Sequence, residues 1–208
     1  DYTPNGRMLT RTNEFAEAGL PLVCCPGTNG WQSHGTRLGV SMRNIHQFAG
    51  IAREHGAEGI LNTDWGDGGH RNTLGVSLHG AAYGAACSWN YGATPGPESD
   101  EFTRTFTAAV FGDESGALAS YLRTIGDDEY GQWAYHALLE SLREPRAFGR
   151  DFAQARTLID KVELSDDELT AKIEAATGLA EAGVPVAPTA ATPSFLATAL
   201  EEFALANA

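Results

Sequence analysis

Residues 64–70 carry an unusual concentration of side chains that are able to bind a ligand. Asp64, Trp65, Asp67 and His70 fall within seven residues and are separated by glycines. Tryptophan offers a flat apolar face that stacks on a sugar ring, and carboxylates accept hydrogen bonds from hydroxyl groups. Glycine allows positive φ angles and a close approach of the backbone to a ligand. The segment therefore predicts a sugar-binding loop.

The same residues have other interpretations. Asp64 can cap a turn or the next helix, and Trp65 can belong to the core. Asp64, Asp67 and His70 can also act as oxygen and nitrogen ligands of a metal ion, although their spacing is not a specific metal signature. No nucleophile elbow, phosphate-binding loop or dinucleotide fingerprint occurs in the sequence. We therefore predict neither a metal nor a cofactor.

A second polar loop, residues 26–37, contains Trp31 and Arg37. Trp31 lies among glycine and polar residues that offer it little local core, which favours a place in the same binding site. Arg37 either contacts the substrate or pairs with Asp64 or Asp67, in which case it holds the two loops together. Both tryptophans and Arg37 are thus candidate substrate-binding residues.

The elements that must position these loops repeat along the chain. Short apolar runs at 20–25 and 57–63 predict strands that are buried on both faces, as in a parallel sheet. Apolar spacing predicts helices at 8–18, 40–55 and 76–89, and the small residues of the last one allow close approach to the sheet. Alternation of this kind predicts parallel strands with helices on their faces, and such folds bind ligands at the carboxyl ends of their strands.

The second half of the chain reads as helical, with apolar spacing at 101–111 and 115–125. Two βα units cannot close a barrel, which needs ~250 residues. We therefore expect an α/β fold in which residues 1–93 form the last βα units of an incomplete (β/α)8 TIM-type barrel. A turn-rich linker at 94–99 and an all-helical C-terminal region at 100–208 follow.

The net negative charge of the chain excludes some classes of binding partner. It has 27 acidic and 14 basic residues and a net charge of −13, which argues against a nucleic-acid binder. Residues 1–97 hold seven acidic and six basic residues, so the half with the loops is nearly neutral and suits an uncharged substrate. No apolar run approaches the ~20 residues of a membrane span, and we expect a soluble protein. Cys24 and Cys25 read as small buried hydrophobic residues.

Several motifs together resemble one family. Cys-Pro-Gly-Thr-Asn-Gly-Trp at 25–31 precedes Arg37, and Thr-Asp-Trp-Gly-Asp-Gly-Gly-His occupies 63–70. His-Gly-Ala-Glu-Gly at 55–59 and Tyr-Gly-Ala-Ala at 83–86 add to these. The pattern resembles the end of the catalytic barrel of bacterial glycoside hydrolase family 20, the β-N-acetylhexosaminidases. The resemblance covers roughly residues 8–126.

This resemblance implies an enzyme with a (β/α)8 barrel. Such an enzyme hydrolyses terminal N-acetylhexosamine residues from glycans with retention of configuration. In the family the acetamido oxygen of the sugar attacks C1, an exception to the scheme with two catalytic carboxylates. Trp65 matches the tryptophan that walls the sugar pocket. Asp67 stands where the family usually has a glutamate that binds ring hydroxyls, and the shorter acid alters those contacts.

The family also uses an adjacent Asp-Glu pair on a middle strand. In this chain Asp-Glu occurs at Asp100, Asp113, Asp128 and Asp167, and none follows a buried strand. The chain begins at Asp1 without a methionine or a signal-peptide pattern, so we expect it to begin mid-protein, which leaves its compartment open. We therefore expect the catalytic pair upstream of Asp1, and the chain alone is not expected to be active. Its partners would be an N-acetylhexosaminide and the remainder of the barrel.

Two hypotheses from other classes remain. One is a non-catalytic carbohydrate-binding or helical interaction module that has kept barrel-like loops. The other is a metal-dependent hydrolase that uses Asp64, Asp67 and His70 as ligands. An Asp-Glu pair after an apolar strand upstream favours the glycosidase over the first, and metal analysis of the purified protein tests the second.

Overall fold

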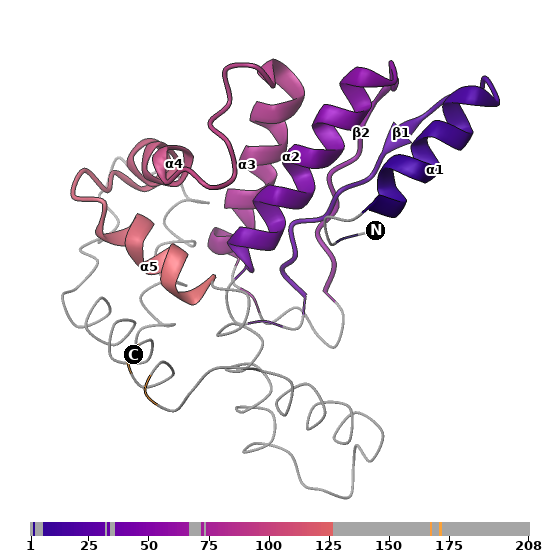
Figure 1. The fold of residues 1–208 in the computed structure, drawn as a ribbon. Helices are drawn as coiled ribbons and strands as arrows, with labels where there is room; N and C mark the ends of the chain where they lie inside the picture. Colours follow the sequence, from indigo (N-terminus) through magenta and orange to yellow (C-terminus); the bar gives the residue numbers. More distant parts are fainter. Residues whose placement is uncertain are drawn as a thin grey trace, which may run out of the picture.

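The computed structural model describes residues 2, 6–31, 33, 36–66, 72, 74–126, 167 and 171. Within these residues the chain is rich in helix and has two short strands (Figure 1). The elements in chain order are α1 (Gly6–Glu17), β1 (Val23–Cys24), α2 (Leu38–Glu54), β2 (Gly59–Ile60), α3 (Leu74–Asn90), α4 (Glu101–Phe111) and α5 (Ala117–Ile125). Each lies where the sequence predicts a helix or a strand.

The two strands are parallel, as the alternation of elements predicts. Val23 pairs with Gly59 and Cys24 pairs with Ile60. The N–H of Leu61 donates to the Cys24 carbonyl at 2.9 Å, which carries the pairing past the end of β2. Because α2 connects the strands, β1, α2 and β2 form one βαβ unit.

Helices cover one face of this small sheet. Side chains from α1, β1 and α2 form a buried cluster there, with residues Met8, Cys24, Phe48, Ile51 and Ala52. Ile60 of β2 packs against the same cluster. This packing confirms the prediction that Cys24 is buried.

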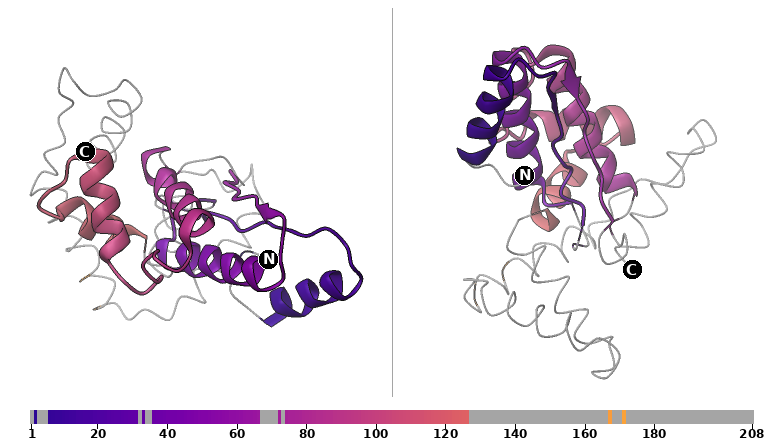
Figure 2. Two further views of the ribbon diagram at one scale, coloured as in Figure 1. Left: turned by 90° about the horizontal axis from the view of Figure 1, so that it is seen from above. Right: turned by 90° about the vertical axis from the view of Figure 1, so that its right-hand side faces the viewer.

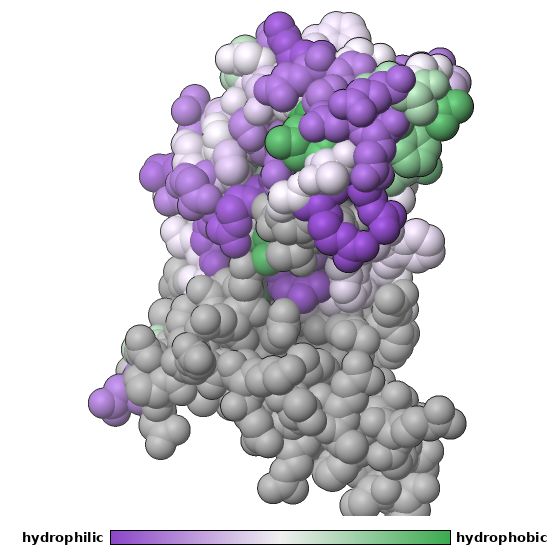
Figure 3. Space-filling view, turned by 45° about the vertical axis from the view of Figure 1, so that its right-hand side comes forward, coloured by the Kyte–Doolittle hydropathy of each residue, from purple (hydrophilic) through white to green (hydrophobic). Residues whose placement is uncertain are grey.

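The opposite face of the sheet is open. Val23 is 48% exposed and Leu61 is 59% exposed, and Cys25 is exposed as well. The predictions that the strands are buried on both faces and that Cys25 is buried are therefore wrong for the described residues. Alternate residues of a strand point to opposite faces, and the helices cover only the face to which Cys24 points. Apolar patches interrupt the mostly hydrophilic surface of the described part in Figure 3.

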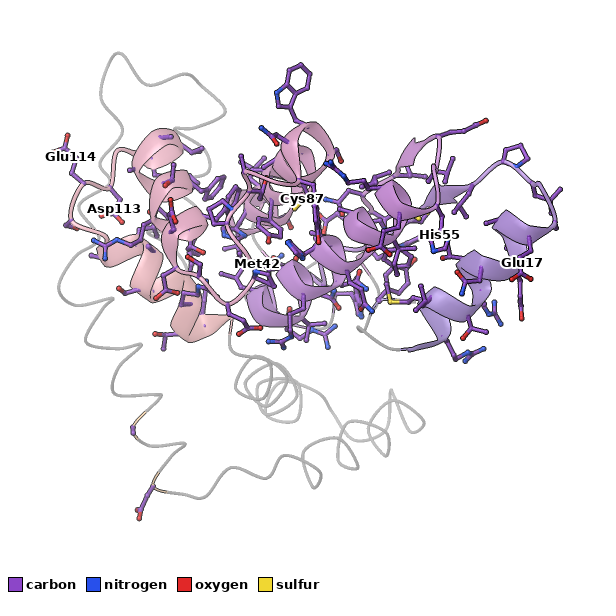
Figure 4. All side chains as sticks on the ribbon, turned by 45° about the horizontal axis from the view of Figure 1, so that its top comes forward. Glu17, Met42, His55, Cys87, Asp113 and Glu114 are labelled. Atoms are coloured by element: carbon purple, nitrogen blue, oxygen red, sulfur yellow. The ribbon has the colours of Figure 1, made fainter. Side chains whose placement is uncertain are left out.

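Helix α3 packs closely against the carboxyl ends of the strands. A Cβ on Gly80 would lie 2.9 Å from the Thr28 side chain, and a Cβ on Gly84 would collide with the amide of Asn62. The predicted close approach of this small-residue helix is therefore confirmed. Between α2 and α3 lies a second buried cluster, with residues Met42, Ile45, Ala49, Tyr83 and Cys87 (Figure 4).

Helices α4 and α5 pack against α2 and α3, at the opposite end of the described part from α1 (Figure 2). The buried side chains of this third cluster are Leu38, Val76, Phe106, Phe111, Leu118, Tyr121 and Leu122. The predicted linker at 94–99 falls in the turn segment between α3 and α4. None of the helices in the described ranges is long and apolar enough to cross a membrane.

Asp113 organises the start of α5. Its Oδ1 accepts hydrogen bonds from the Ser115 hydroxyl and the Gly116 N–H, and its Oδ2 accepts from the N–H groups of Leu118 and Ala119. Partial burial raises the pKa of the Asp113 carboxyl, but these hydrogen bonds outweigh it and hold the pKa below its usual value. Asp113 is therefore a helix-capping residue, far from α1 and its last residue Glu17 (Figure 4).

Candidate functional site

The two candidate loops begin side by side at one end of the sheet. Gly27 and Thr63 form a parallel bridge just beyond the strands. The Thr63 N–H donates to the Pro26 carbonyl at 2.9 Å, and the Thr28 N–H donates to the Thr63 carbonyl at 2.9 Å. Because the strands are parallel, both loops leave the sheet at the carboxyl ends, which is the edge that binds ligands in parallel α/β folds.

Asp64 connects the second loop to the first. Its Oδ1 accepts a hydrogen bond from the Thr28 hydroxyl at 2.5 Å. A Cβ on Gly30 would lie 3.0 Å from the same oxygen, so the backbone of the first loop passes directly beside the carboxylate. Helix α3 begins only at Leu74, so Asp64 is not its N-cap. Asp64 thus orders both loops while it stays at the surface.

Trp65 presents its ring to solvent. It is 48% exposed, so the interpretation of this side chain as part of the core is wrong. Its Nε1 donates to the Thr63 hydroxyl at 3.0 Å. Since the one polar group of the indole is occupied in this way, what remains exposed is the apolar ring, directly beside the Asp64 carboxylate along the chain.

Trp31 lies between Tyr2 and Arg37, the second of which belongs to the same loop. The Tyr2 and Trp31 ring centroids are 4.9 Å apart in an edge-to-face arrangement, and the Arg37 Cζ lies 5.3 Å from the Trp31 ring centroid. Arg37 therefore makes a cation–π contact with Trp31, an interaction that the sequence did not suggest. Trp31 is half-buried and holds the first loop through these contacts.

Asp67 and His70 lie outside the described residues, so the role of Asp67 toward sugar hydroxyls and the metal-ligand hypothesis stay predictions. Among the residues that the structure describes, no group of three or more histidine, cysteine, aspartate or glutamate side chains is arranged to hold a metal ion. Of the six candidate residues, the structure brings Asp64 and Trp65 to the end of β2 and sets Trp31 and Arg37 in the loop that follows β1.

A buried amide joins both loops to α3. The Asn72 Nδ2 donates to the Thr36 hydroxyl at 2.8 Å and to the Ser77 hydroxyl at 2.9 Å, and all three side chains are buried. A Cβ on Gly30 would lie 2.7 Å from the same nitrogen, so the first loop can pass here only with glycine. Sequence reasoning missed this contact because hydrogen bonds between residues 36 apart leave no local pattern.

A second buried amide, on α2, hydrogen-bonds to the backbone of the first loop. Asn44 of α2 is fully buried, and its Oδ1 accepts a hydrogen bond from the Gly27 N–H at 3.0 Å. Asn29 has a positive φ of 58°, and its Nδ2 donates to the Gly27 carbonyl at 3.0 Å. A signal for Asn44 existed in the sequence, because it lies beside Ile45 and four residues before Phe48, on the buried stripe of α2.

The interactions at this end of the sheet are thus mostly hydrogen bonds between neutral groups. Burying such groups is unfavourable unless each finds a partner, so the shared hydrogen bonds hold the described parts of the first loop against α2 and α3. Among the described side chains named in this subsection, Asp64 and Arg37 carry charge.

The comparisons with known proteins give no further assignment. No family model, curated protein or solved structure matches this chain. The resemblance to glycoside hydrolase family 20 accordingly rests on the sequence motifs at 25–37, 55–59, 63–70 and 83–86.

Proposed function

We propose that this chain supplies part of the sugar pocket of a retaining β-N-acetylhexosaminidase that resembles glycoside hydrolase family 20. The observation that carries the proposal is the half-exposed Trp65 just beyond the carboxyl end of β2, with its indole N–H occupied by Thr63, next to the exposed Asp64 in the sequence. An exposed aromatic ring can stack on the apolar C–H face of a sugar, and an exposed carboxylate can accept hydrogen bonds from its hydroxyl groups.

The open sides of the sheet support the barrel that this proposal requires. Within the described residues β1 and β2 pair only with each other, so each strand has one free edge. The exposed apolar side chains Val23 and Leu61 lie on the uncovered face, which in a closed barrel is the packed interior. A groove of about 360 Å³ lies between α1 and β1, with Arg11 and Phe15 of α1 and Val23 of β1 in its lining.

In the proposed enzyme residues of this chain bind and orient the sugar. Trp65 forms an apolar wall, and Asp64 together with Asp67 accepts hydrogen bonds from ring hydroxyls. The attack on C1 comes from the acetamido oxygen of the substrate, as the family resemblance implies. In the family an adjacent Asp-Glu pair polarises this group and protonates the leaving oxygen, and in this proposal the remainder of the barrel supplies it.

Kinetics of the complete protein on an aryl N-acetyl-β-glucosaminide test the proposal. Trp65→Ala is expected to raise KM and lower kcat, with kcat/KM reduced about tenfold or more, since a loss of ~1.4 kcal/mol in transition-state binding is tenfold. Trp89→Ala is the matched control, because Trp89 is 93% exposed at the end of α3, and its kinetics are expected to equal those of the wild type. Unchanged kinetics of Trp65→Ala would count against the proposal.

The same exposed tryptophan also fits a carbohydrate-binding module without catalysis. Such a module would bind N-acetylglucosamine and lose that binding in Trp65→Ala, while the wild type would not hydrolyse the aryl substrate. The sequence upstream of Asp1 separates the two functions before any assay. An Asp-Glu pair after an apolar strand belongs to the enzyme, and its absence leaves the binding module.

A further inference from the structure

Trp65 lies on an exposed loop, and an exposed side chain normally has rotational freedom. The structure restrains it through one short chain of hydrogen bonds. The indole Nε1 donates to the Thr63 hydroxyl at 3.0 Å, and the Thr63 hydroxyl donates to the Pro26 carbonyl at 2.9 Å. A hydroxyl has a single proton and two lone pairs, so the direction of both bonds is fixed.

Thr63 is itself held rigidly. Its backbone N–H donates to the Pro26 carbonyl, and its own carbonyl accepts from the Thr28 N–H, both at 2.9 Å. It also forms the parallel bridge with Gly27. A β-branched side chain on a fixed backbone has few χ1 choices, so the position of its hydroxyl is set by the pairing of the two strand ends. The carbonyl of Pro26 therefore fixes the direction in which the indole points.

We propose that Thr63 is a positioning residue that aims the Trp65 ring at the ligand, through the chain from the Trp65 indole to the Thr63 hydroxyl and on to the Pro26 carbonyl. The inference rests on the proposed function for the role of Trp65 as a sugar platform. It adds that the platform is oriented from Pro26, in the loop that follows β1. A loop that contained the tryptophan but lacked this hydroxyl would bind the sugar more weakly, because the ring would have to be ordered on binding.

The test compares two substitutions of Thr63 in the complete protein. Thr63→Val replaces the hydroxyl by a methyl group at the same branch point, and we expect kcat/KM on the aryl N-acetyl-β-glucosaminide to fall about fivefold, mainly through KM. Thr63→Ser restores the hydroxyl, and its kcat/KM is expected to stay above about half of the wild-type value. Urea unfolding of Thr63→Val shows the conditions in which this variant is fully folded. We expect the loss of kcat/KM under those conditions, which separates a loss of positioning from a loss of folding.

A double-mutant cycle makes the assignment specific. Trp65→Phe retains an aromatic ring but has no N–H, so adding Thr63→Val to it is expected to change kcat/KM by less than about twofold. An equal fivefold loss in both backgrounds, or a loss in Thr63→Ser as large as in Thr63→Val, would overturn the positioning role. If Trp65→Phe and Trp65→Ala both keep wild-type kinetics, the proposed function itself is wrong. If both Trp65 variants lose activity while Thr63→Val keeps it, the proposed function stands and the positioning role of Thr63 is wrong.

Discussion

Two groups of side chains pack against α3, and one is polar while the other is aromatic. The loop cluster consists of Thr28, Thr36, Asn72 and Ser77, which are polar and joined by hydrogen bonds to one another or to Asp64. The helix cluster consists of the buried His79, Tyr83 and Phe106 and the partly buried Phe102. Phe102 and Phe106 are stacked, and the other ring contacts are edge to face. The net stability from each hydrogen bond is small, about 1 kcal/mol, whereas buried aromatic rings contribute several times more. The helix cluster thus stabilises the fold, and the loop cluster fixes the geometry of the candidate site.

Phe106→Ala is expected to show the largest effect on stability. Phe106 is 6% exposed and its ring contacts those of His79 and Phe111 at centroid distances of 5.1 and 5.7 Å. Removing a buried phenylalanine ring costs about 3–5 kcal/mol of unfolding free energy, measured in urea. The sugar affinity of the folded fraction should not change. Trp65→Ala, at an exposed position, should lower the unfolding free energy by less than about 1 kcal/mol, and the reverse order would refute the division of roles.

Acid should weaken the helix cluster through His79. Burial and the nearby Arg123 lower the pKa of this histidine to about 3, and its Nε2 lies 3.1 Å from the Thr103 hydroxyl. The folded state therefore resists protonation, so the contribution of neutral His79 is complete above the unfolded pKa of about 6.5 and declines as the pH falls toward the folded value. Between pH 7.5 and 5.0 we expect a loss of about 2 kcal/mol of unfolding free energy.

The control for this pH effect is His79→Gln, which does not titrate. Urea unfolding of both proteins at the two pH values cancels the contributions of the carboxyl groups, which the two proteins share. A wild-type protein whose stability falls no more steeply than that of His79→Gln would show that the ring is accessible to protons in the folded state.

Thr28→Val should show the smallest effect on stability. The substitution keeps the branched shape that packs against Gly80 but removes the hydroxyl that donates to Asp64. Because Asp64 is exposed, water replaces much of the lost bond, and we expect a change below about 1 kcal/mol in unfolding free energy. We expect KM for the aryl sugar to rise all the same, since the two loops lose a link. A large loss of stability with an unchanged KM would place Thr28 with the helix cluster.

The sequence predicts helices well where apolar spacing and a stop signal agree. The range 101–111 coincides with α4, which ends before Gly112 in the left-handed conformation. The start of α5 was placed at residue 115 and lies at Ala117, because Gly116 has a φ of 77° and the turn with Asp113 and Ser115 precedes the helix. Local signals of this kind depend only on neighbouring residues.

Strand extent and the loop cluster depend on distant partners. The predicted strands at 20–25 and 57–63 appear as two-residue strands, since only one edge of each is paired in the described part of the chain. The exposed Trp65 was found from its residue type and its place after a strand. Asn72 was missed because its role comes from a contact with Thr36 in the other loop. Patterns along the chain thus predict the elements and the loops but not the hydrogen bonds that fix them.

The central claim is that the end of the sheet near Trp65 contacts the sugar. The most direct measurement is the ¹H–¹⁵N spectrum of the tryptophan side chains in the complete protein, titrated with N-acetylglucosamine. Trp65→Phe assigns one indole signal and Trp89→Phe assigns another. The account predicts that the Trp65 signal shifts with ligand concentration while the Trp89 signal stays in place. A Trp65 signal that does not move at a saturating concentration of N-acetylglucosamine would contradict it.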